Sequence, residues 1–216
     1  GVGGWTSYQG LQQLRRDVLP MQPRIVTFYY GWNDHWASFG VEDKDVGAFN
    51  SDRSLAMHFA DWRLVQLFNF FAIKLYGNEE GAAQPRRVSD ADFTKNLIEM
   101  VEQARDNGIV PVLITAPSSH IKGEEPVYLA ERWLSDIDEL VPLHQRYADL
   151  VREVAREEEV LLLDLLAKFY RLPAKDLKEK YFVEDGIHLT SEGCWEVANA
   201  LYRFFEQEGL LEKILE

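Results

Sequence analysis

The sequence predicts an α/β fold in which helices cover both faces of a parallel sheet. Three short apolar runs, each rich in β-branched, aromatic or leucine side chains, alternate with longer segments that have a helical period. When a helix connects two strands of one sheet, the strands normally lie parallel. We therefore expect a three-layer α/β/α sandwich that forms one domain over residues 1–216.

The first half of the chain is expected to supply one helix, one strand and an insertion. Apolar side chains recur with a helical period over residues 7–19, and Pro20 ends that helix. Residues 24–30 form a continuous β-branched and aromatic run that ends at Gly31, which is typical of a strand buried on both faces. Residues 41–88 follow no such pattern, and we expect a helical or irregular insertion over one end of the sheet.

The second half alternates strands and helices, with no sign of a second domain. Ser89 is a typical N-cap for a helix that ends at Asn107 and Gly108. The other expected elements are strands over residues 109–115 and 160–164 and helices over residues 142–158 and 192–207. The last helix has an expected inward face of Trp195, Val197, Ala198, Leu201 and Phe204.

The composition argues against several classes of function. A formal net charge of −13 would repel a nucleic-acid backbone or an anionic membrane, so neither is expected as a partner. No apolar run approaches the ~18 residues of a membrane-spanning helix. Cys194 is the only cysteine, which excludes a disulfide within the chain, and we expect a buried helical thiol. No group of His and carboxylate residues has the spacing of a metal site, so we expect neither a metal nor a cofactor. The cellular location stays open.

The most informative motif is Asp185-Gly186-Ile187-His188. An Asp-x-x-His turn can hold a carboxylate against an imidazole, and the imidazole then acts as a base because its ordinary pKa of about 6.5 lies near neutrality. Two other polar segments, residues 31–34 and residues 116–120, follow the first two expected strands. Because working residues gather at the carboxyl ends of parallel strands, we expect all three segments to meet at one rim.

Two features near the N-terminus can stabilise an oxyanion at that rim. The side-chain amide of Asn33 is a suitable donor, and losing one such donor typically costs ~3 to 4 kcal/mol of transition-state stabilisation. A simple turn-forming role after the strand is the alternative interpretation of Asn33. Residues 1–7 form a glycine-rich turn before a helix, and their backbone amides can serve the same oxyanion. The spacing is not that of a dinucleotide-binding fingerprint.

In order and approximate spacing, these segments resemble three of the four blocks of the SGNH (GDSL-like) hydrolase family. The resemblance implies that the backbone N–H of Gly4 and the side chain of Asn33 form the oxyanion hole. It also implies that His188 activates a nucleophilic serine and that Asp185 orients the His. The expected activity is that of an esterase, acyl-hydrolase or acyl transferase that works through an acyl-enzyme. The expected substrate is a small ester, such as an acylated carbohydrate or lipid.

The family's first block, Gly-Asp-Ser with the nucleophile, is absent from this sequence. The flavodoxin-like strand order implied by the resemblance would also leave residues 24–30 at an open edge, and exposed apolar edge strands invite aggregation. We therefore expect an N-terminally incomplete domain whose serine lies upstream of Gly1. A missing segment or a partner chain would complete the sheet, and the 216 residues alone would be inactive. The alternative is a non-catalytic ligand-binding or interaction module that has lost the nucleophile.

Several other polar and aromatic residues have weaker interpretations. Ser118 and Ser119 follow a strand at the expected rim, but their surroundings do not resemble a nucleophile elbow, so a polar loop contact or a helix cap is preferred. The expected substrate contacts are Asp34, His35 and Ser118. The histidines on helical patterns, expected to pack, are His58 and His144. The aromatic residues expected to pack the insertion, or else to line an acyl or sugar pocket, are Trp62, Phe68, Phe70, Phe71 and Tyr76.

Overall fold

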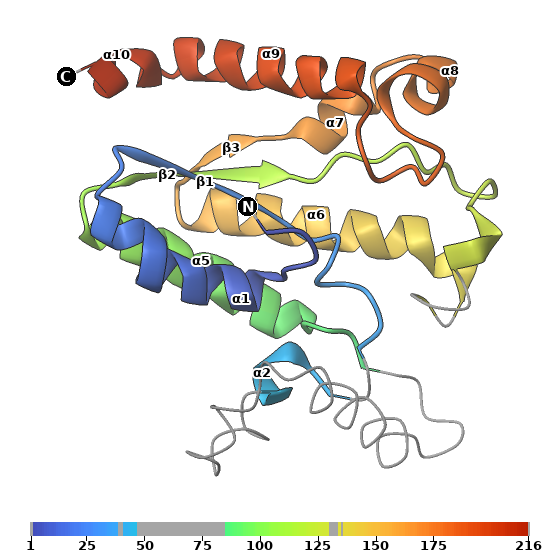
Figure 1. Ribbon diagram of the computed structural model, residues 1–216, viewed down its shortest axis with the longest axis horizontal. Coiled ribbons are helices and arrows are strands. Elements are labelled where there is room, and N and C mark those ends of the chain that lie inside the picture. The colour runs from blue at the N-terminus through green and yellow to red at the C-terminus, as the bar shows by residue number, and fades with distance from the viewer. Residues whose placement is uncertain (1, 39–40, 47–84, 130–133, 135, 216) are drawn as a thin grey trace.

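A computed structural model describes residues 2–38, 41–46, 85–129, 134 and 136–215. Within these residues a parallel sheet of three strands lies between two groups of helices (Figure 1). This arrangement confirms the predicted α/β class with helices on both faces of a parallel sheet.

The sheet has the order β1-β2-β3, with β2 in the centre. Its strands are β1 (Ile25–Tyr30), β2 (Val110–Thr115) and β3 (Leu161–Leu163), each within two residues of its predicted bounds. The register sets Ile25 opposite Val110 and Tyr30 opposite Thr115. Within the described residues β1 pairs only with β2, so its other edge is free, as the sequence led us to expect.

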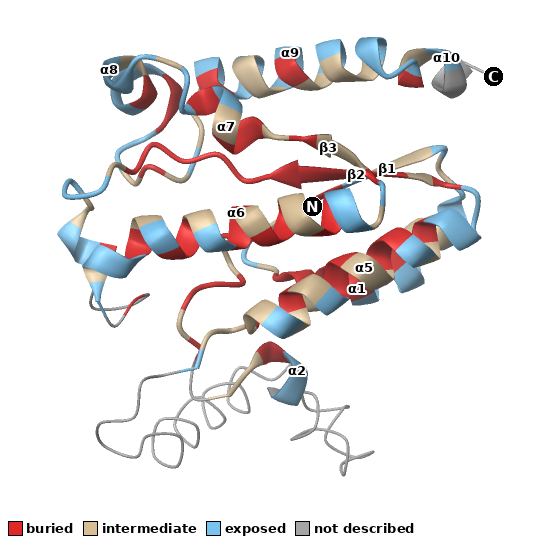
Figure 2. Ribbon diagram, turned by 180° about the vertical axis from the view of Figure 1, so that it is seen from behind, coloured by how far each residue is buried: buried red, intermediate tan, exposed pale blue. Residues whose placement is uncertain are grey.

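The side chains of β2 alternate between two hydrophobic cores. Leu113 belongs to the core shared with the first group of helices, whereas Val112 and Ile114 belong to the core on the opposite face. The first face is covered by α1 (Ser7–Gln13), α5 (Asp90–Asp106) and α6 (Leu140–Glu157). The second face carries α7 (Leu165–Phe169), α9 (Ser191–Gln207) and α10 (Leu210–Leu215). Figure 2 shows the buried residues gathered on β2 and on the helix sides that face it.

The helix boundaries follow local chemistry. The hydroxyl of Ser89 accepts a hydrogen bond from the Asp92 amide and begins α5, as predicted. Helix α1 ends earlier than predicted, because a π-helical turn (Leu14–Val18) and a 3-10 turn (Leu19–Met21) replace its second half. The sequence patterns missed α7, α10 and five short segments of the described residues, namely α2 (Asp43–Val46), α8 (Ala174–Asp176), a π-helical turn (Leu177–Tyr181) and two 3-10 turns (Val127–Leu129 and Ile137–Glu139).

The predicted inward face of α9 is wrong at two positions. Trp195 is 70% exposed and Ala198 is also exposed, whereas the other three predicted residues are half-buried. Helix α9 packs mainly against the π-helical turn (Leu177–Tyr181) and α10, so the face that it buries is narrow. Cys194 is exposed, which corrects the expected buried thiol.

Most of the predicted insertion lies outside the described residues. This holds for residues 47–84, which contain the expected helix-like segment, His58 and the five aromatic residues named above. The two ends of the insertion are described, and they meet: the Asp43 amide donates a hydrogen bond to the Arg87 carbonyl at 2.8 Å. In the part of the chain that the structure describes, no helix combines the length and apolar character needed to cross a membrane.

Candidate active site

A cavity of about 830 Å³ lies beside β1 and reaches the loop that follows it. Its lining includes Gly4, Asn33, Asp185 and His188, which come from three segments far apart in the sequence. The structure thus brings together the four residues that the sequence singles out for the oxyanion hole and the base. The three expected substrate contacts (Asp34, His35 and Ser118) do not line this cavity, because each is almost fully buried behind it.

The turn 185–188 is organised around the Asp185 carboxylate. Its Oδ1 accepts hydrogen bonds from the backbone amides of Ile187 and His188 at 2.8 and 2.9 Å, and its Oδ2 lies 2.6 Å from His188 Nδ1. Gly186 permits this tight turn with a φ of 70°. Partial burial opposes ionisation of Asp185, but the hydrogen bonds from His188 and Ile187 outweigh it and lower the pKa of the carboxyl.

His188 is held through Nδ1, and most of its side chain is exposed. The side chain is 78% exposed, and Nδ1 is occupied by the ionised Asp185. Nδ1 therefore carries the hydrogen, which leaves Nε2 unprotonated in the neutral ring. A neutral imidazole oriented in this way can accept a proton from a group in the cavity, and the carboxylate then stabilises the imidazolium.

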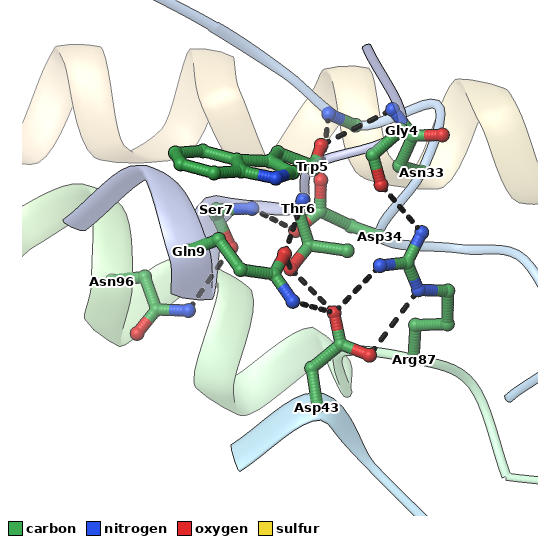
Figure 3. Close-up of polar contacts among 11 residues, drawn as sticks. Gly4, Trp5, Thr6, Ser7, Gln9, Asn33, Asp34, Asp43, Arg87 and Asn96 are labelled. Carbon is green, nitrogen blue, oxygen red and sulfur yellow. Dashed lines mark hydrogen bonds and ion pairs between the residues drawn. The ribbon is translucent and has the colours of Figure 1, made fainter. Parts of the chain in front are cut away.

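Gly4 and Asn33 lie on two loops that contact each other. The loop of residues 2–6, which we call the glycine loop, turns at Gly4 with a φ of 81°. Asn33 Nδ2 donates to the Trp5 carbonyl at 3.1 Å and keeps a second amide hydrogen for another acceptor (Figure 3). The backbone amides of a glycine turn beside a side-chain amide are the elements from which an oxyanion hole is built.

Asp34 joins the start of α1, directly after the glycine loop, to the start of the Asn33 loop. The carboxylate is fully buried and accepts hydrogen bonds from the Ser7 amide at 2.7 Å and the Gly31 amide at 3.0 Å (Figure 3). Burial raises the pKa of Asp34 to about 6, against the opposing effect of these hydrogen bonds. In this structure Asp34 is a structural link between loops and has no surface on the cavity.

Two buried histidines and a tryptophan support the Asn33 loop. His144 Nε2 lies 2.9 Å from the Ala116 carbonyl and so carries a hydrogen, and His144 Nδ1 then accepts from His35 Nε2 at 3.2 Å. Burial lowers the pKa of His144 to about 3 and that of His35 well below its ordinary value, so both rings are neutral. The Trp32 ring stacks on His144 with centroids 3.8 Å apart.

Ser118 is placed for support instead of nucleophilic attack. It is fully buried, its Oγ lies 3.1 Å from His120 Nδ1, and it also accepts the His120 amide at 3.0 Å. Ser119 is 4% exposed, and its amide donates to the Gly186 carbonyl at 3.1 Å. Residues 118–120 thus contact the turn 185–188 from behind the cavity.

An ion pair that the sequence analysis missed braces the glycine loop. Arg87 binds both oxygens of Asp43, with Nη2 at 2.9 Å from Oδ2, and donates from Nη1 to the Gly4 carbonyl at 2.8 Å (Figure 3). Asp43 Oδ2 also accepts from Thr6 Oγ1 at 2.7 Å and Gln9 Nε2 at 2.8 Å. The only available signal was one acidic and one basic residue at the two ends of the insertion, a pattern too common to be informative.

The part of the chain that the structure describes contains no group of three or more His, Cys, Asp or Glu residues arranged to hold a metal ion.

Comparisons with known proteins identify the family of this chain. The sequence model of the GDSL-like Lipase/Acylhydrolase family matches residues 1–195. An uncharacterized lipoprotein of Bacillus subtilis (strain 168), YqeF, is 21% identical over 224 residues, covering 99% of this chain and 73% of that protein.

Solved structures of esterases share the fold. The lipase/acylhydrolase from Enterococcus faecalis superposes with a TM-score of 0.58 at 17% identity, covering 95% of this chain and 72% of that chain. An acetyl xylan esterase, AlAXEase, also gives a TM-score of 0.58 at 17% identity, covering 94% of this chain and 77% of that chain. At such identities the likeness establishes the fold.

Proposed function

Because the chain belongs to the GDSL-like lipase/acylhydrolase family, we propose that it works as a serine esterase that transfers an acyl group to water through an acyl-enzyme. The observation that carries the proposal is the shared cavity: Gly4 and Asn33 line it together with Asp185 and His188, and the His188 side chain is 78% exposed.

Each of the site residues has a defined role in this reaction. His188 Nε2 takes the proton of the attacking serine hydroxyl while the serine oxygen bonds to the ester carbonyl carbon. The carbonyl oxygen becomes an oxyanion, which the Gly4 N–H and the second hydrogen of Asn33 Nδ2 stabilise. When the tetrahedral intermediate collapses, His188 gives the proton to the leaving alkoxide. A water molecule then attacks the acyl-enzyme while His188 takes its proton. The acid is released when His188 returns that proton to the serine oxygen.

The proposed nucleophile lies outside these 216 residues. Gly-Asp-Ser is absent from the sequence, and Ser118 is buried with its hydroxyl engaged by His120. The cavity continues along the free edge of β1, where Thr27 and Tyr29 line it. A further parallel strand beside β1 would end next to His188, and a serine on the following turn would face the free Nε2.

The proposed substrate class is an acylated carbohydrate. The cavity walls combine aromatic side chains with a few polar groups, which suits a sugar ring that carries a small ester. One solved relative of the same fold is described as an acetyl xylan esterase. The aromatic residues that line the cavity are Trp5, Tyr29, Tyr30, Trp32, Trp36 and Tyr128.

The test begins with the residues encoded immediately upstream of Gly1. A strand followed by Gly-Asp-Ser supports the esterase, whereas a start codon at this point would favour the non-catalytic binding module. For the 216-residue chain we expect negligible turnover of p-nitrophenyl acetate.

In the serine-bearing protein, Asn33→Ala should lower kcat by roughly a hundredfold, because one oxyanion donor is lost while the fold remains. His188→Ala should abolish turnover. A fall in kcat of less than about threefold in the Asn33 variant would show that Asn33 does not belong to the oxyanion hole. If the 216-residue chain itself hydrolyses the ester and His188→Ala removes that activity, the proposal that the nucleophilic serine lies outside these residues is wrong.

A further inference from the structure

We propose that His120 is a positioning residue that, from behind the cavity, holds the turn 185–188, and with it the proposed base, at a fixed place in the cavity wall. The inference rests on the proposed function, because it assigns His120 a role through His188. His120 does not line the cavity.

The contact between His120 and the turn is direct. His120 Nε2 lies 2.8 Å from the Asp185 carbonyl oxygen, and the neighbouring Ser119 amide donates to the Gly186 carbonyl at 3.1 Å. Two successive residues of one loop therefore bind two successive carbonyls of the turn. The packing leaves no spare room, since a Cβ on Gly186 would lie 2.5 Å from His120 Nε2 and 2.9 Å from Ser119 Oγ.

The surroundings of the ring specify one tautomer. A carbonyl oxygen only accepts, so the hydrogen between His120 and Asp185 must be on Nε2. Ser118 Oγ already accepts the His120 amide, and its own hydrogen is available to His120 Nδ1. Burial lowers the pKa of His120, which keeps the ring neutral with Nδ1 as the acceptor.

His120 also touches the loop that carries Asn33. Its ring packs edge-on against Trp32, with centroids 5.6 Å apart and planes at 79°. Trp32 Nε1 donates to the Pro117 carbonyl at 3.2 Å, so the same loop is hydrogen-bonded to both sides of the site. His120 thus lies between the proposed oxyanion donor and the proposed base, where it can fix their separation. An error of about 1 Å in such a separation can lower a rate by about a hundredfold.

A pair of substitutions separates this role from simple packing. In His120→Gln the side-chain amide reaches the position of Nε2 and can still donate to the Asp185 carbonyl. In His120→Asn it reaches only the position of Nδ1, so that hydrogen bond is lost. Tyr170→Phe is the control for a change beside the ring, since Tyr170 contacts the His120 carbonyl at 3.5 Å and the Ser118 side chain but not the turn.

The readout is amide hydrogen exchange at Ile187 and His188, whose N–H groups bind Asp185 Oδ1. Exchange needs no turnover, so it can be measured in the 216-residue chain. We expect exchange to accelerate about tenfold or more in His120→Asn and to stay within about threefold of the unaltered chain in His120→Gln and Tyr170→Phe. Equal exchange in all four proteins would overturn the proposal.

Two further measurements complete the test. The side-chain ¹⁵N spectrum of the unaltered chain should show His120 protonated at Nε2, and a ring protonated at Nδ1 would overturn the proposal even if the Asn variant does not fold. In the serine-bearing protein, His120→Asn should lower kcat about tenfold to a hundredfold with little change in KM, and the Gln variant should restore it. If exchange responds but no hydrolysis depends on His188, the proposed function fails while the positioning contact remains.

Discussion

A single buried carboxylate, that of Asp34, connects the two loops that carry the proposed oxyanion donors. Its two oxygens accept the amides of Ser7, the first residue of α1 directly after the glycine loop, and of Gly31, at the start of the Asn33 loop. Burial raises the pKa of Asp34 to about 6 from an ordinary value of 3.8. The folded chain therefore holds the Asp34 proton more tightly than the unfolded chain does. The stability that this proton contributes is fully present below pH 3.8 and is lost as the pH rises through 6.

We expect this loss to disappear in Asp34→Asn, whose side chain does not ionise. The free energy of unfolding of the unaltered chain, relative to that of the variant, should fall by about 2 kcal/mol between pH 4 and pH 7. Urea unfolding at several pH values measures the difference. Asp17→Asn is the control, because its hydrogen bond with Arg16 lowers the pKa of Asp17 and reverses the direction of the trend. If the difference in the free energy of unfolding between the two proteins is constant with pH, the pKa of Asp34 is not raised in the folded chain.

At the scale of elements, the two ends of the insertion are joined to the glycine loop. The Arg87 and Asp43 side chains are 19% and 9% exposed, and both reach into the loop that carries Gly4. Removing one member of such a pair leaves a largely buried charge without its partner, which is more costly than losing a surface ion pair. The insertion is therefore coupled, through this pair, to the part of the site proposed to stabilise the oxyanion.

Arg87→Gln should lower the free energy of unfolding by about 2 to 4 kcal/mol and speed amide exchange in residues 2–6. The matched control is Arg86→Gln at the neighbouring position. Arg86 pairs with Asp90 and lies over the Tyr147 ring at 5.8 Å, but its side chain is 40% exposed, so its loss should cost about 1 kcal/mol or less. Urea unfolding and hydrogen exchange measure both effects, and similar results for the two variants would show that Arg87 does not brace the loop.

At the scale of the whole molecule, the features that the sequence predicted depend on local patterns. Three apolar runs and the cap at Ser89 were sufficient for the strands and for the start of α5, because burial and capping act within a few residues. The features that it missed depend on tertiary contacts. The pair of Asp43 and Arg87 joins positions 44 residues apart. The exposure of Trp195 depends on what lies against α9, which a helical period does not specify.

The same limit applies to the candidate site. Asn33, Asp185 and His188 could be grouped because the carboxyl ends of parallel strands meet at one edge, whereas Gly4 was added to them by the resemblance to the hydrolase family. The burial of Asp34, His35 and Ser118 was not foreseeable from their positions after strands. A polar residue at such a position can face the cavity or support it from behind, and only the packing of neighbouring loops decides between these two outcomes.

The free edge of β1 has a consequence for the whole molecule that can be measured. Tyr29 is 44% exposed, Thr27 is also exposed, and the backbone groups on that edge have no strand partner within the described residues. An open edge of this kind pairs readily with another strand. We expect the 216-residue chain to self-associate, increasingly so at high salt, because salt screens the net charge of −13 that otherwise keeps copies apart.

Tyr29→Lys should shift sedimentation velocity profiles toward the monomer, since a charge on the strand makes pairing between two such edges unfavourable. The control is Tyr202→Lys on α9, where an aromatic side chain that is 58% exposed lies away from any strand edge. Addition of the encoded upstream residues should have the same effect as Tyr29→Lys if they contribute the strand beside β1. A chain that is monomeric at every concentration and salt level would show that this edge is protected, and an equal effect of both lysines would assign the association to general surface hydrophobicity.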